Sequence, residues 1–457
     1  MKRIKKHQGN MLEGSLLPSV IRYTIPIILT SVLQLLFNAA DLVVVGRFCG
    51  SVSVGAVGAT GSVTALIVNL FVGLSVGGGV AVAHGIGSRD ERQICEAVHT
   101  AVPLALIGGV VLTVAGVTLS RPLLVLMGTP ENILPLSALY MKIYFCGITF
   151  TVVYNFSAAI LRAAGDTRSP LVFLTTAGVI NVVLNLIFVT VFDMNVAGVA
   201  LATTASQGVA AILVVRALVK RTDACHLELR KMHVYKHQLK KIVRIGLPAG
   251  IQSSLFSISN VIIQSSVNSF GDVLVSGNAA AANLESFLYA SINSFSQTTV
   301  NFVGQNVGAR QYRRANTTVW ICQNCALVVG VTLGVLLFAF GEPLLGIYIS
   351  DSAQAIQYGM VRFSCVAIFY FLMGLLDVST GALRGYGQSF GPMLISVLGI
   401  CGIRVLWVFT IFQIPAFHSP QWLYMSYPVS WGLTMVAQMI LFFRIRNQFL
   451  HQDITDI

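Results

Sequence analysis

Long apolar stretches almost without charge recur along the whole chain and decide what it can fold into. The first runs from Val20 to Val45, and a helix that crosses a bilayer needs roughly 20 such residues. The chain has 457 residues, of which 55% are hydrophobic and only 10% charged, whereas a soluble domain carries about 25% charged residues. No stretch alternates as a barrel strand does, and helices satisfy their own backbone in lipid. The sequence therefore predicts an all-α polytopic membrane protein.

We expect twelve transmembrane helices in closely linked pairs. They lie near 18–45, 52–82, 97–119, 137–161, 170–192, 196–218, 246–270, 276–304, 318–340, 361–383, 393–413 and 424–446. The second and eighth stretches are longer than a bilayer requires, which indicates tilt or continuation beyond the membrane. The basic start MKRIKKHQGN precedes an apolar run much longer than the core of a signal peptide, so we expect the first span to be permanent.

The basic residues predict the orientation of the chain. With a cytoplasmic amino terminus, most of the 29 lysines and arginines fall at the inner ends of the spans, and both termini are cytoplasmic. Arg47, Arg121, Lys142 and Arg362 are expected at the outer ends, and Arg404 within the eleventh span. The net charge of +12 then reflects topology and attraction to anionic membrane lipids, and it does not indicate nucleic acid as a partner.

Three separated segments recur at an offset of 221 or 222 residues. The pairs are RYTIP at Arg22–Pro26 with RIGLP at Arg244–Pro248, GIGSRDER at Gly85–Arg92 with NVGARQYR at Asn306–Arg313, and LRAAGDTRSP at Leu161–Pro170 with LRGYGQSFGP at Leu383–Pro392. Each homologous half has six spans, so the halves share one orientation and form a parallel repeat. Such repeats are typical of transporters that work by alternating access.

The repeat divides the chain into two lobes and their connections. We expect a cytoplasmic amino-terminal segment 1–17, an N-lobe 18–218, a basic cytoplasmic linker 219–245, a C-lobe 246–446 and a cytoplasmic tail 447–457. The linker is expected to be solvated. Its cysteine and histidines lack a fixed ligand framework, so no metal site is predicted.

The carboxylate of Asp41 lies inside the first span. Gln34, Asn38 and Asp41 are spaced i, i+4 and i+7, which places them on one face of a helix. An ionised carboxylate within the membrane costs about 2.5 to 3.5 kcal/mol even on mild insertion scales. This polar face is therefore expected to look into a helix bundle or a water-filled cavity, where Asp41 has a function or a partner.

The order of these features resembles the multidrug and toxic compound extrusion (MATE) family, whose superfamily includes lipid and oligosaccharide flippases. The resemblance rests on the pattern IPxxLxxxxxxxxNxxDxxxVG in the first span, VGQNVGA in the eighth, and the repeated segments after the fourth and tenth, and it covers Gly14 to Arg446. It implies two parallel-repeat six-helix lobes around a central cleft. It also implies export of small organic, often cationic and amphipathic, compounds in exchange for H+ or Na+ by a monomer in the bacterial inner membrane, with no cofactor.

The resemblance implies a cation-coupling site in the N-lobe, formed by Asp41, Asn155, Asn181 and Thr203. Asn185 matches a further position that is acidic in many relatives. The lobe therefore has one buried carboxylate instead of an interacting pair, which leaves the coupling ion open. Read without the family, the two asparagines of the fifth span are one turn apart and also suit interhelical hydrogen bonding.

The C-lobe has its own intramembrane acids, Glu285 and Asp377. Asp377 lies 222 residues after Asn155, so the repeat places it at the position of the proposed N-lobe ligand. Both acids are candidates for a second site, and either one has the alternative of pairing with Arg404 or of being a neutral acid in a helix contact. Polar and aromatic residues expected to line the substrate cleft are Gln34, Asn38, Gln252, Tyr289 and Tyr370.

Other functional classes fit less well. The GLSVG of Gly73–Gly77 matches a nucleophile motif but lies in a span without the strand–turn–helix context, and as GxxxG it indicates close helix packing. No catalytic residue, and no enzyme, is therefore predicted. Isolated acids in two lobes suit alternating access better than a channel. The alternative that stays open is a flippase for a lipid-linked or polyisoprenoid substrate, although such proteins hold pyrophosphate with several cationic residues.

Overall fold

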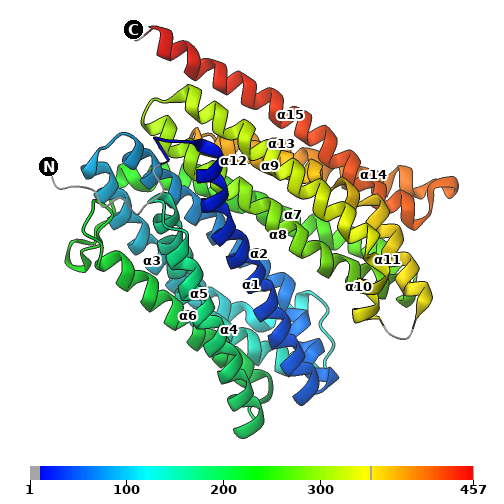
Figure 1. Cartoon of the computed structure of the whole chain (residues 1–457). Coiled ribbons are helices and arrows are strands. Elements are labelled where there is room, and N and C mark those ends of the chain that lie inside the picture. The colour runs from blue at the N-terminus through cyan, green and yellow to red at the C-terminus, as the bar shows by residue number, and fades with distance from the viewer. Residues whose placement is uncertain (1–10, 350–351, 456–457) are drawn as a thin grey trace. The chain divides into compact units, whose positions relative to one another are not determined.

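The structure is a computed structural model that describes residues 11–349 and 352–455. Residues 1–10 of the proposed segment 1–17, and residues 456–457 of the proposed tail 447–457, lie outside the described residues. Throughout the described ranges every regular element is a helix (Figure 1). The predicted all-α class is confirmed.

The first half of the chain contains six long helices. They are α1 (Leu16–Phe48), α2 (Ser51–Gly87), α3 (Glu91–Leu126), α4 (Leu134–Ala163), α5 (Arg168–Leu186) and α6 (Asn195–Val219). A π-helical turn, η1 (Ile187–Val191), continues α5. The boundaries agree with the expected spans to within a few residues at most ends, and α2 and α3 run further. α3, for example, begins with a polar turn that contains Glu91, ahead of its apolar stretch.

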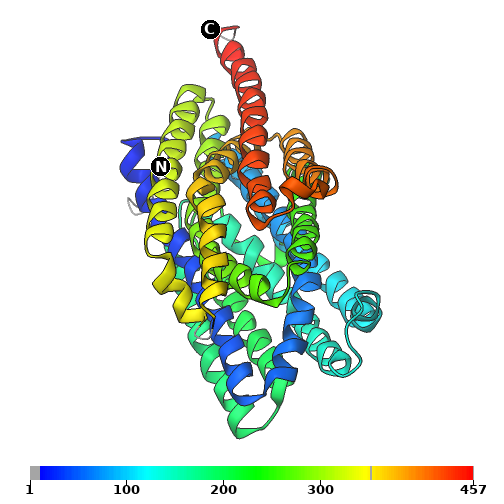
Figure 2. The same cartoon turned by 90° about the vertical axis from the view of Figure 1, so that its right-hand side faces the viewer.

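The second half follows the same order with more breaks (Figures 1 and 2). Its elements are η2 (Leu229–Lys231), α7 (Lys236–Asn268), α8 (Asp272–Gly308), α9 (Tyr312–Ala339), α10 (Gly341–Tyr348), α11 (Ala353–Cys365), η3 (Ala367–Phe369), α12 (Tyr370–Gly385), α13 (Phe390–Ser396), η4 (Val397–Gly402), α14 (Ile403–Phe409), η5 (Ile411–Gln413), η6 (Pro415–Phe417) and α15 (Pro420–Thr455). α7 begins ten residues before the expected span 246–270, because the basic end of the linker is helical.

The backbone repeats along with the sequence motifs. α2 and α8 are each 37 residues long. Residues with positive φ, a conformation that non-glycine residues rarely adopt, recur at the ends of equivalent helices. The pairs are Gly50 with Gly271, Arg89 with Arg310, and Gly165 with Gly387. The same turns are therefore built twice, 221 or 222 residues apart, and the predicted internal repeat is confirmed.

Eleven helical segments of the described chain are long and apolar enough to cross a membrane. α8, which we expected as the eighth of twelve spans, is not among them. Its second half carries polar side chains that lower the mean hydropathy, including Thr298, Thr299 and Asn301, and these three are buried. A helix whose polar residues face protein can cross a bilayer without being apolar all round.

The described chain forms two compact units. The first contains Ile25–Gly250, and the second contains Met11–Thr24 together with the residues from Ile251 onward. α1 and α7 therefore each contribute their first turns to one unit and the remainder to the other. Pro26 and Pro248 lie within these two helices close to the points of division, and a proline inside a helix removes a backbone hydrogen bond.

In the first unit, glycines allow the start of α7 to cross α2 at backbone contact. A Cβ atom on Gly73 would collide with the main chain of Gly250, and one on Gly77 would collide with the main chain of Ile242 and Gly246. The GLSVG segment is therefore a helix-packing contact, as its GxxxG spacing predicts.

In the second unit, the start of α1 is attached at the equivalent crossing by different chemistry. Thr24 and Thr298, the counterparts of Gly246 and Gly77 in the repeat, share a hydrogen bond of 2.8 Å between their hydroxyls. Nearby, the rings of Tyr23 and Phe302 meet edge to face, with centroids 5.3 Å apart. One crossing thus depends on close backbone approach and the other on side-chain contacts.

The linker after α6 is packed on the first unit, which corrects the expectation of a solvated segment. Cys225 and Leu227 are buried. The imidazole of His99 in α3 accepts a hydrogen bond from the backbone N–H of Glu228 at 3.0 Å, and its other nitrogen lies 2.8 Å from the carbonyl oxygen of Cys95. Because a neutral imidazole has one donor and one acceptor, this arrangement attaches the linker to α3.

Candidate functional site

A polar cluster around Asp41 joins α1 to α5 and α6. Asn185 donates a hydrogen bond from Nδ2 to one carboxylate oxygen of Asp41, and the hydroxyl of Thr203 donates to the other at 3.5 Å. Asn181 completes the cluster, because its Nδ2 donates to Thr203 Oγ1 and its Oδ1 accepts from Asn185 Nδ2, both at 3.3 Å. Four of the five residues proposed for cation coupling are therefore brought together.

Local structure explains why these side chains converge. Asn181 and Asn185 lie one turn apart on the face of α5 that is turned inward, and both are buried. α5 and α6 are neighbours in the chain and pack together, which brings Thr203 to that face. The Oδ1 atom of Asn185 is buried without a hydrogen-bond partner among the described residues. The cluster thus holds an unused carbonyl oxygen beside a carboxylate.

The other N-lobe candidates lie outside this hydrogen-bonded cluster. Asn155 donates its amide to the carbonyl oxygen of Thr151, one turn earlier in α4, at 2.9 Å. Gln34 and Asn38 share a face of α1 with Asp41, as expected, and both are exposed.

Asp377 in α12 is the centre of a second polar group, in the second unit. Its carboxylate accepts a hydrogen bond from Asn293 Nδ2 at 3.1 Å, and the same amide lies 3.3 Å from the hydroxyl of Tyr289. Arg384, two turns further along α12, donates to Gln252 Oε1 at 2.9 Å. Three of the residues predicted from the sequence, Asp377, Tyr289 and Gln252, thus lie in or beside one group of polar side chains.

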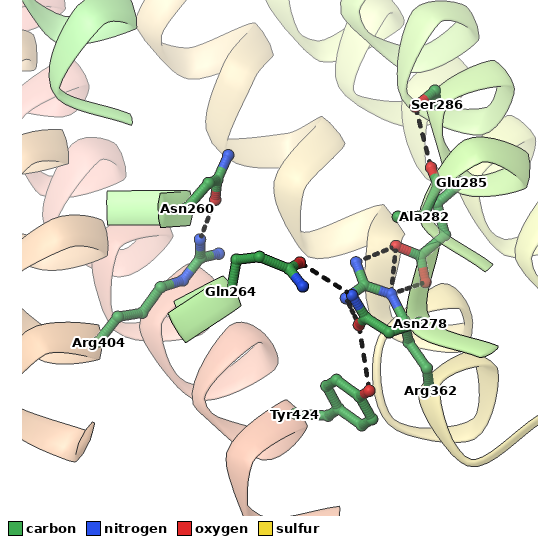
Figure 3. A network of polar contacts seen from close by, with 9 residues as sticks. All are labelled: Asn260, Gln264, Asn278, Ala282, Glu285, Ser286, Arg362, Arg404 and Tyr424. Atoms are coloured by element: carbon green, nitrogen blue, oxygen red, sulfur yellow. Dashed lines mark hydrogen bonds and ion pairs between the residues drawn. The ribbon is translucent and has the colours of Figure 1, made fainter. Parts of the chain in front are cut away.

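Glu285 is paired, but not with the residue that the sequence analysis considered. Arg362 donates to both carboxylate oxygens of Glu285, with Nη2 at 2.6 Å from Oε2 and Nε at 3.1 Å from Oε1 (Figure 3). Arg362 was expected at the outer end of a span, yet it is only 7% exposed. It is buried because it lies on the inward face of α11 together with Ala355 and Gly359.

A chain of amides and a tyrosine continues from this ion pair. Asn278 Oδ1 accepts from Arg362 Nη1 at 2.7 Å and from the hydroxyl of Tyr424 at 3.1 Å. Asn278 Nδ2 donates to Gln264 Oε1 at 3.1 Å (Figure 3). The sequence analysis did not single out Asn278, Arg362 or Tyr424 as site residues. The signal available was the i, i+4, i+7 spacing of the small residues Ala355 and Gly359 with Arg362.

Arg404 of α14 is buried next to this chain but has no carboxylate partner among the described residues. Its Nε donates to Ser430 Oγ at 3.2 Å and its Nη1 lies 3.5 Å from Asn260 Oδ1. The guanidinium lies over the ring of Tyr427, 4.0 Å from the centroid. Tyr370 packs against Trp431, with ring centroids 4.9 Å apart, so aromatic side chains surround this part of the second unit.

Comparison with known proteins identifies the family. A family model described as MatE matches residues 26–187 and 248–410. The chain is 28% identical over 392 residues to the probable multidrug resistance protein YpnP of Bacillus subtilis, covering 86% of this chain and 87% of that protein. It is 28% identical over 400 residues to the probable multidrug resistance protein NorM of Thermotoga maritima, covering 84% and 83%.

The fold agrees with this assignment. A solved outward-facing structure of a multidrug resistance MATE family transporter of the MOP superfamily matches with a TM-score of 0.91 at 21% identity, covering 98% of this chain and 100% of that one. The two matched segments of the family model also correspond to the two halves of the repeat. The chain therefore belongs to the MatE family, whose members are membrane transporters and not enzymes.

Proposed function

We propose that this protein exports small organic, often cationic and amphipathic, compounds in exchange for H+ or Na+ by alternating access. The observation that carries the proposal is the environment of Asp41, whose two carboxylate oxygens are held only by the neutral donors Asn185 and Thr203. No described lysine or arginine forms an ion pair with it. A carboxylate kept in a membrane span without a fixed counterion suits a site that a mobile cation fills and leaves.

The cluster offers what either ion needs. A proton on Asp41 would neutralise the carboxylate and keep its hydrogen bonds with Asn185 and Thr203. Sodium, like other hard cations, takes oxygen ligands, and the cluster holds the Asp41 carboxylate, the Thr203 hydroxyl and the amide oxygens of Asn181 and Asn185. A half-turn of the Asn185 amide would replace its donor nitrogen beside Asp41 by the oxygen that now lacks a partner.

The relatives support drug-like cargo. YpnP and NorM are both described as probable multidrug resistance proteins. We extend that class of cargo to this chain, together with a location in the bacterial inner membrane, cytoplasmic termini and a monomeric state. Asp377, with Asn293 beside it, is proposed as a second polar site in the C-lobe, whereas the pairing of Glu285 with Arg362 leaves Glu285 less suited to coupling.

A flippase for a lipid-linked or polyisoprenoid substrate is the rival. The sequence indicated only Arg404 within a span, whereas the structure buries Arg362 as well. Because pyrophosphate needs several cations, this second buried arginine is an argument for the flippase. Glu285 already neutralises Arg362, however, so only Arg404 among these groups lacks a carboxylate. Export of small compounds therefore accounts for the site better.

The test is ethidium uptake into everted membrane vesicles, driven in turn by a proton gradient and by a sodium gradient. We expect the wild type to transport under one gradient and Asp41→Asn to lose that transport while inserting normally. Transport that persists in Asp41→Asn would place coupling at Asp377 instead. A correctly inserted wild type that moves neither ethidium nor a panel of other organic cations would favour the flippase.

A further inference from the structure

Among the residues that the structure describes, no carboxylate compensates the charge of Arg404. The residue is 4% exposed and lies in the membrane-spanning segment Phe390–Gln413. Its partners among the described residues are neutral, and the 3.5 Å contact with Asn260 is at the long limit for a hydrogen bond. A guanidinium inside a membrane span is costly unless it finds an anion, and the described residues offer it none.

The neighbouring charges increase the imbalance. Arg362 and Arg404 face the same ring, that of Tyr427, at 5.4 and 4.0 Å from its centroid. Glu285 binds Arg362 through both carboxylate oxygens, so it is not free to serve Arg404. The group of two guanidinium ions and one carboxylate therefore keeps one positive charge, located on Arg404.

The guanidinium of Arg404 points toward Asn260, an exposed residue of α7. Asn260 is exposed, and it lies at the edge of Arg404 that carries Nη1 (Figure 3). One face of the guanidinium is covered by Tyr427, and the ring of Trp431 lies 5.6 Å away. An acid that displaced the weakly held amide of Asn260 would reach the planar edge of the guanidinium, the geometry that carboxylates bind through two parallel hydrogen bonds.

We propose that Arg404 is a subsite for the acidic group of an aromatic cargo, with Asn260 at its entrance. The acid supplies the missing negative charge, and the aromatic part of the cargo packs on the partly exposed ring of Tyr370, which rests on the buried ring of Trp431. The inference rests on the proposed transport function and narrows its cargo: aromatic acids, including compounds that also carry a cationic group, are bound in preference to compounds without an acid.

Binding to the purified full-length protein tests the subsite. The probes are 7-diethylaminocoumarin-3-carboxylate and its uncharged methyl ester, measured by equilibrium dialysis against protein-free micelles. We expect the wild type to bind the acid at least tenfold more tightly than the ester. Arg404→Gln should abolish that preference, Arg404→Lys should keep part of it, and Arg121→Gln, a change at an exposed arginine of α3, should leave it intact.

A second variant separates binding from folding. Asn260→Asp places a carboxylate within reach of Arg404. Because the position is exposed, the variant should fold normally. Its new carboxylate should compete with the acid probe for Arg404, so that affinity for the acid falls about tenfold and affinity for the ester is unchanged. Equal wild-type affinities for acid and ester, or variants at residues 404 and 260 that both retain the preference, would overturn the proposal.

Inorganic phosphate distinguishes a free anion from a cargo group. We expect phosphate alone to compete only weakly, because it lacks the aromatic part. Phosphate that binds as tightly as the coumarin acid, with the same dependence on Arg404, would overturn the assignment to cargo. The binding readout is independent of coupling, because Asp41→Asn should lose ion-driven transport yet still bind the acid, so failure of one proposal leaves the other testable.

Discussion

Arg362 and Glu285 form a buried ion pair in which Nη2 lies 2.6 Å from Oε2, with side chains 8% and 2% exposed. Removing one partner of such a pair leaves an uncompensated buried charge, which typically costs about 3–5 kcal/mol. We therefore expect Glu285→Gln to lower the thermal unfolding temperature of the detergent-solubilised protein markedly.

The matched control is Glu96→Gln. Glu96 pairs with Arg92 at 2.8 Å, but the arginine side chain is 87% exposed, and exposed helix pairs contribute about 0.3–0.5 kcal/mol. A Glu285→Gln variant as stable as this control, with altered ion dependence of transport, would show that Glu285 couples and does not merely stabilise.

Asn185 and Asn155 should differ sharply on substitution. Asn185 contacts the Asp41 carboxylate and has a spare buried oxygen, whereas Asn155 bonds to its own helix. If sodium drives transport, Asn185→Ala should raise the sodium concentration for half-maximal efflux about tenfold, or about 1.4 kcal/mol, because the variant loses an amide oxygen that would coordinate the ion. Asn155→Ala should change it less than about twofold.

Proteoliposomes with a set internal sodium concentration provide the measurement. If the proton is the coupling ion, sodium should not change the efflux rate of either variant. In that case the pH dependence of efflux should shift in Asn185→Ala and stay unchanged in Asn155→Ala. Equal shifts for the two alanine variants would place Asn155 in the site after all.

The glycine crossing of α2 and α7 should tolerate no side chain. A methyl group on Gly77 would collide with the main chain of Ile242, and overpacking of this kind costs about 1–3 kcal/mol. Gly58, in the same helix, has open space at its Cβ position, and alanine there is favoured over glycine by about 1 kcal/mol of helix propensity. Gly77→Ala should therefore lower the unfolding temperature, and Gly58→Ala should raise it slightly. The reverse order would contradict close backbone contact between α2 and α7 at Gly77.

The packing of the linker segment 219–235 on the first unit should weaken at low pH. Burial by itself would raise the pKa of Asp223, but the Arg221 guanidinium, 2.5 Å away, and the backbone N–H of Cys225 hold that pKa below its usual value. A carboxylate with a lowered pKa stabilises the fold above its unfolded value, about 3.9, and this contribution is lost as the pH falls through the folded pKa.

Hydrogen exchange of peptides from 219–235, corrected for the intrinsic pH effect, measures this loosening. We expect protection at pH 7 that declines below about pH 4, and Asp223→Asn should show reduced protection at pH 7 with little further change in acid. Protection that is the same in Asp223→Asn and in the wild type at neutral pH would contradict a role for the pair.

Much of the architecture follows from local patterns. Apolar runs predict the helices, the 221–222 offset predicts turns such as Gly165 and Gly387, and the one-turn spacing of Asn181 and Asn185 places both on one face. These features depend on residues close in sequence or on a copied segment, so the chain itself carries them. The carboxylate of Asp41 stood out within an apolar span, the family pattern added Thr203, and the structure brings both into contact with that face.

Only the tertiary structure decided which groups pair across helices. The sequence analysis considered Arg404 as a partner for Glu285, whereas packing of α11 against α8 buries Arg362 against Glu285 and leaves Arg404 with neutral partners. Likewise, the first turns of α1 belong to the second unit and the first turns of α7 to the first unit. No local sequence pattern predicts this assignment. Periodicity determines which face of a helix is polar, but the partner that meets this face depends on helix rotation and depth, which long-range packing sets.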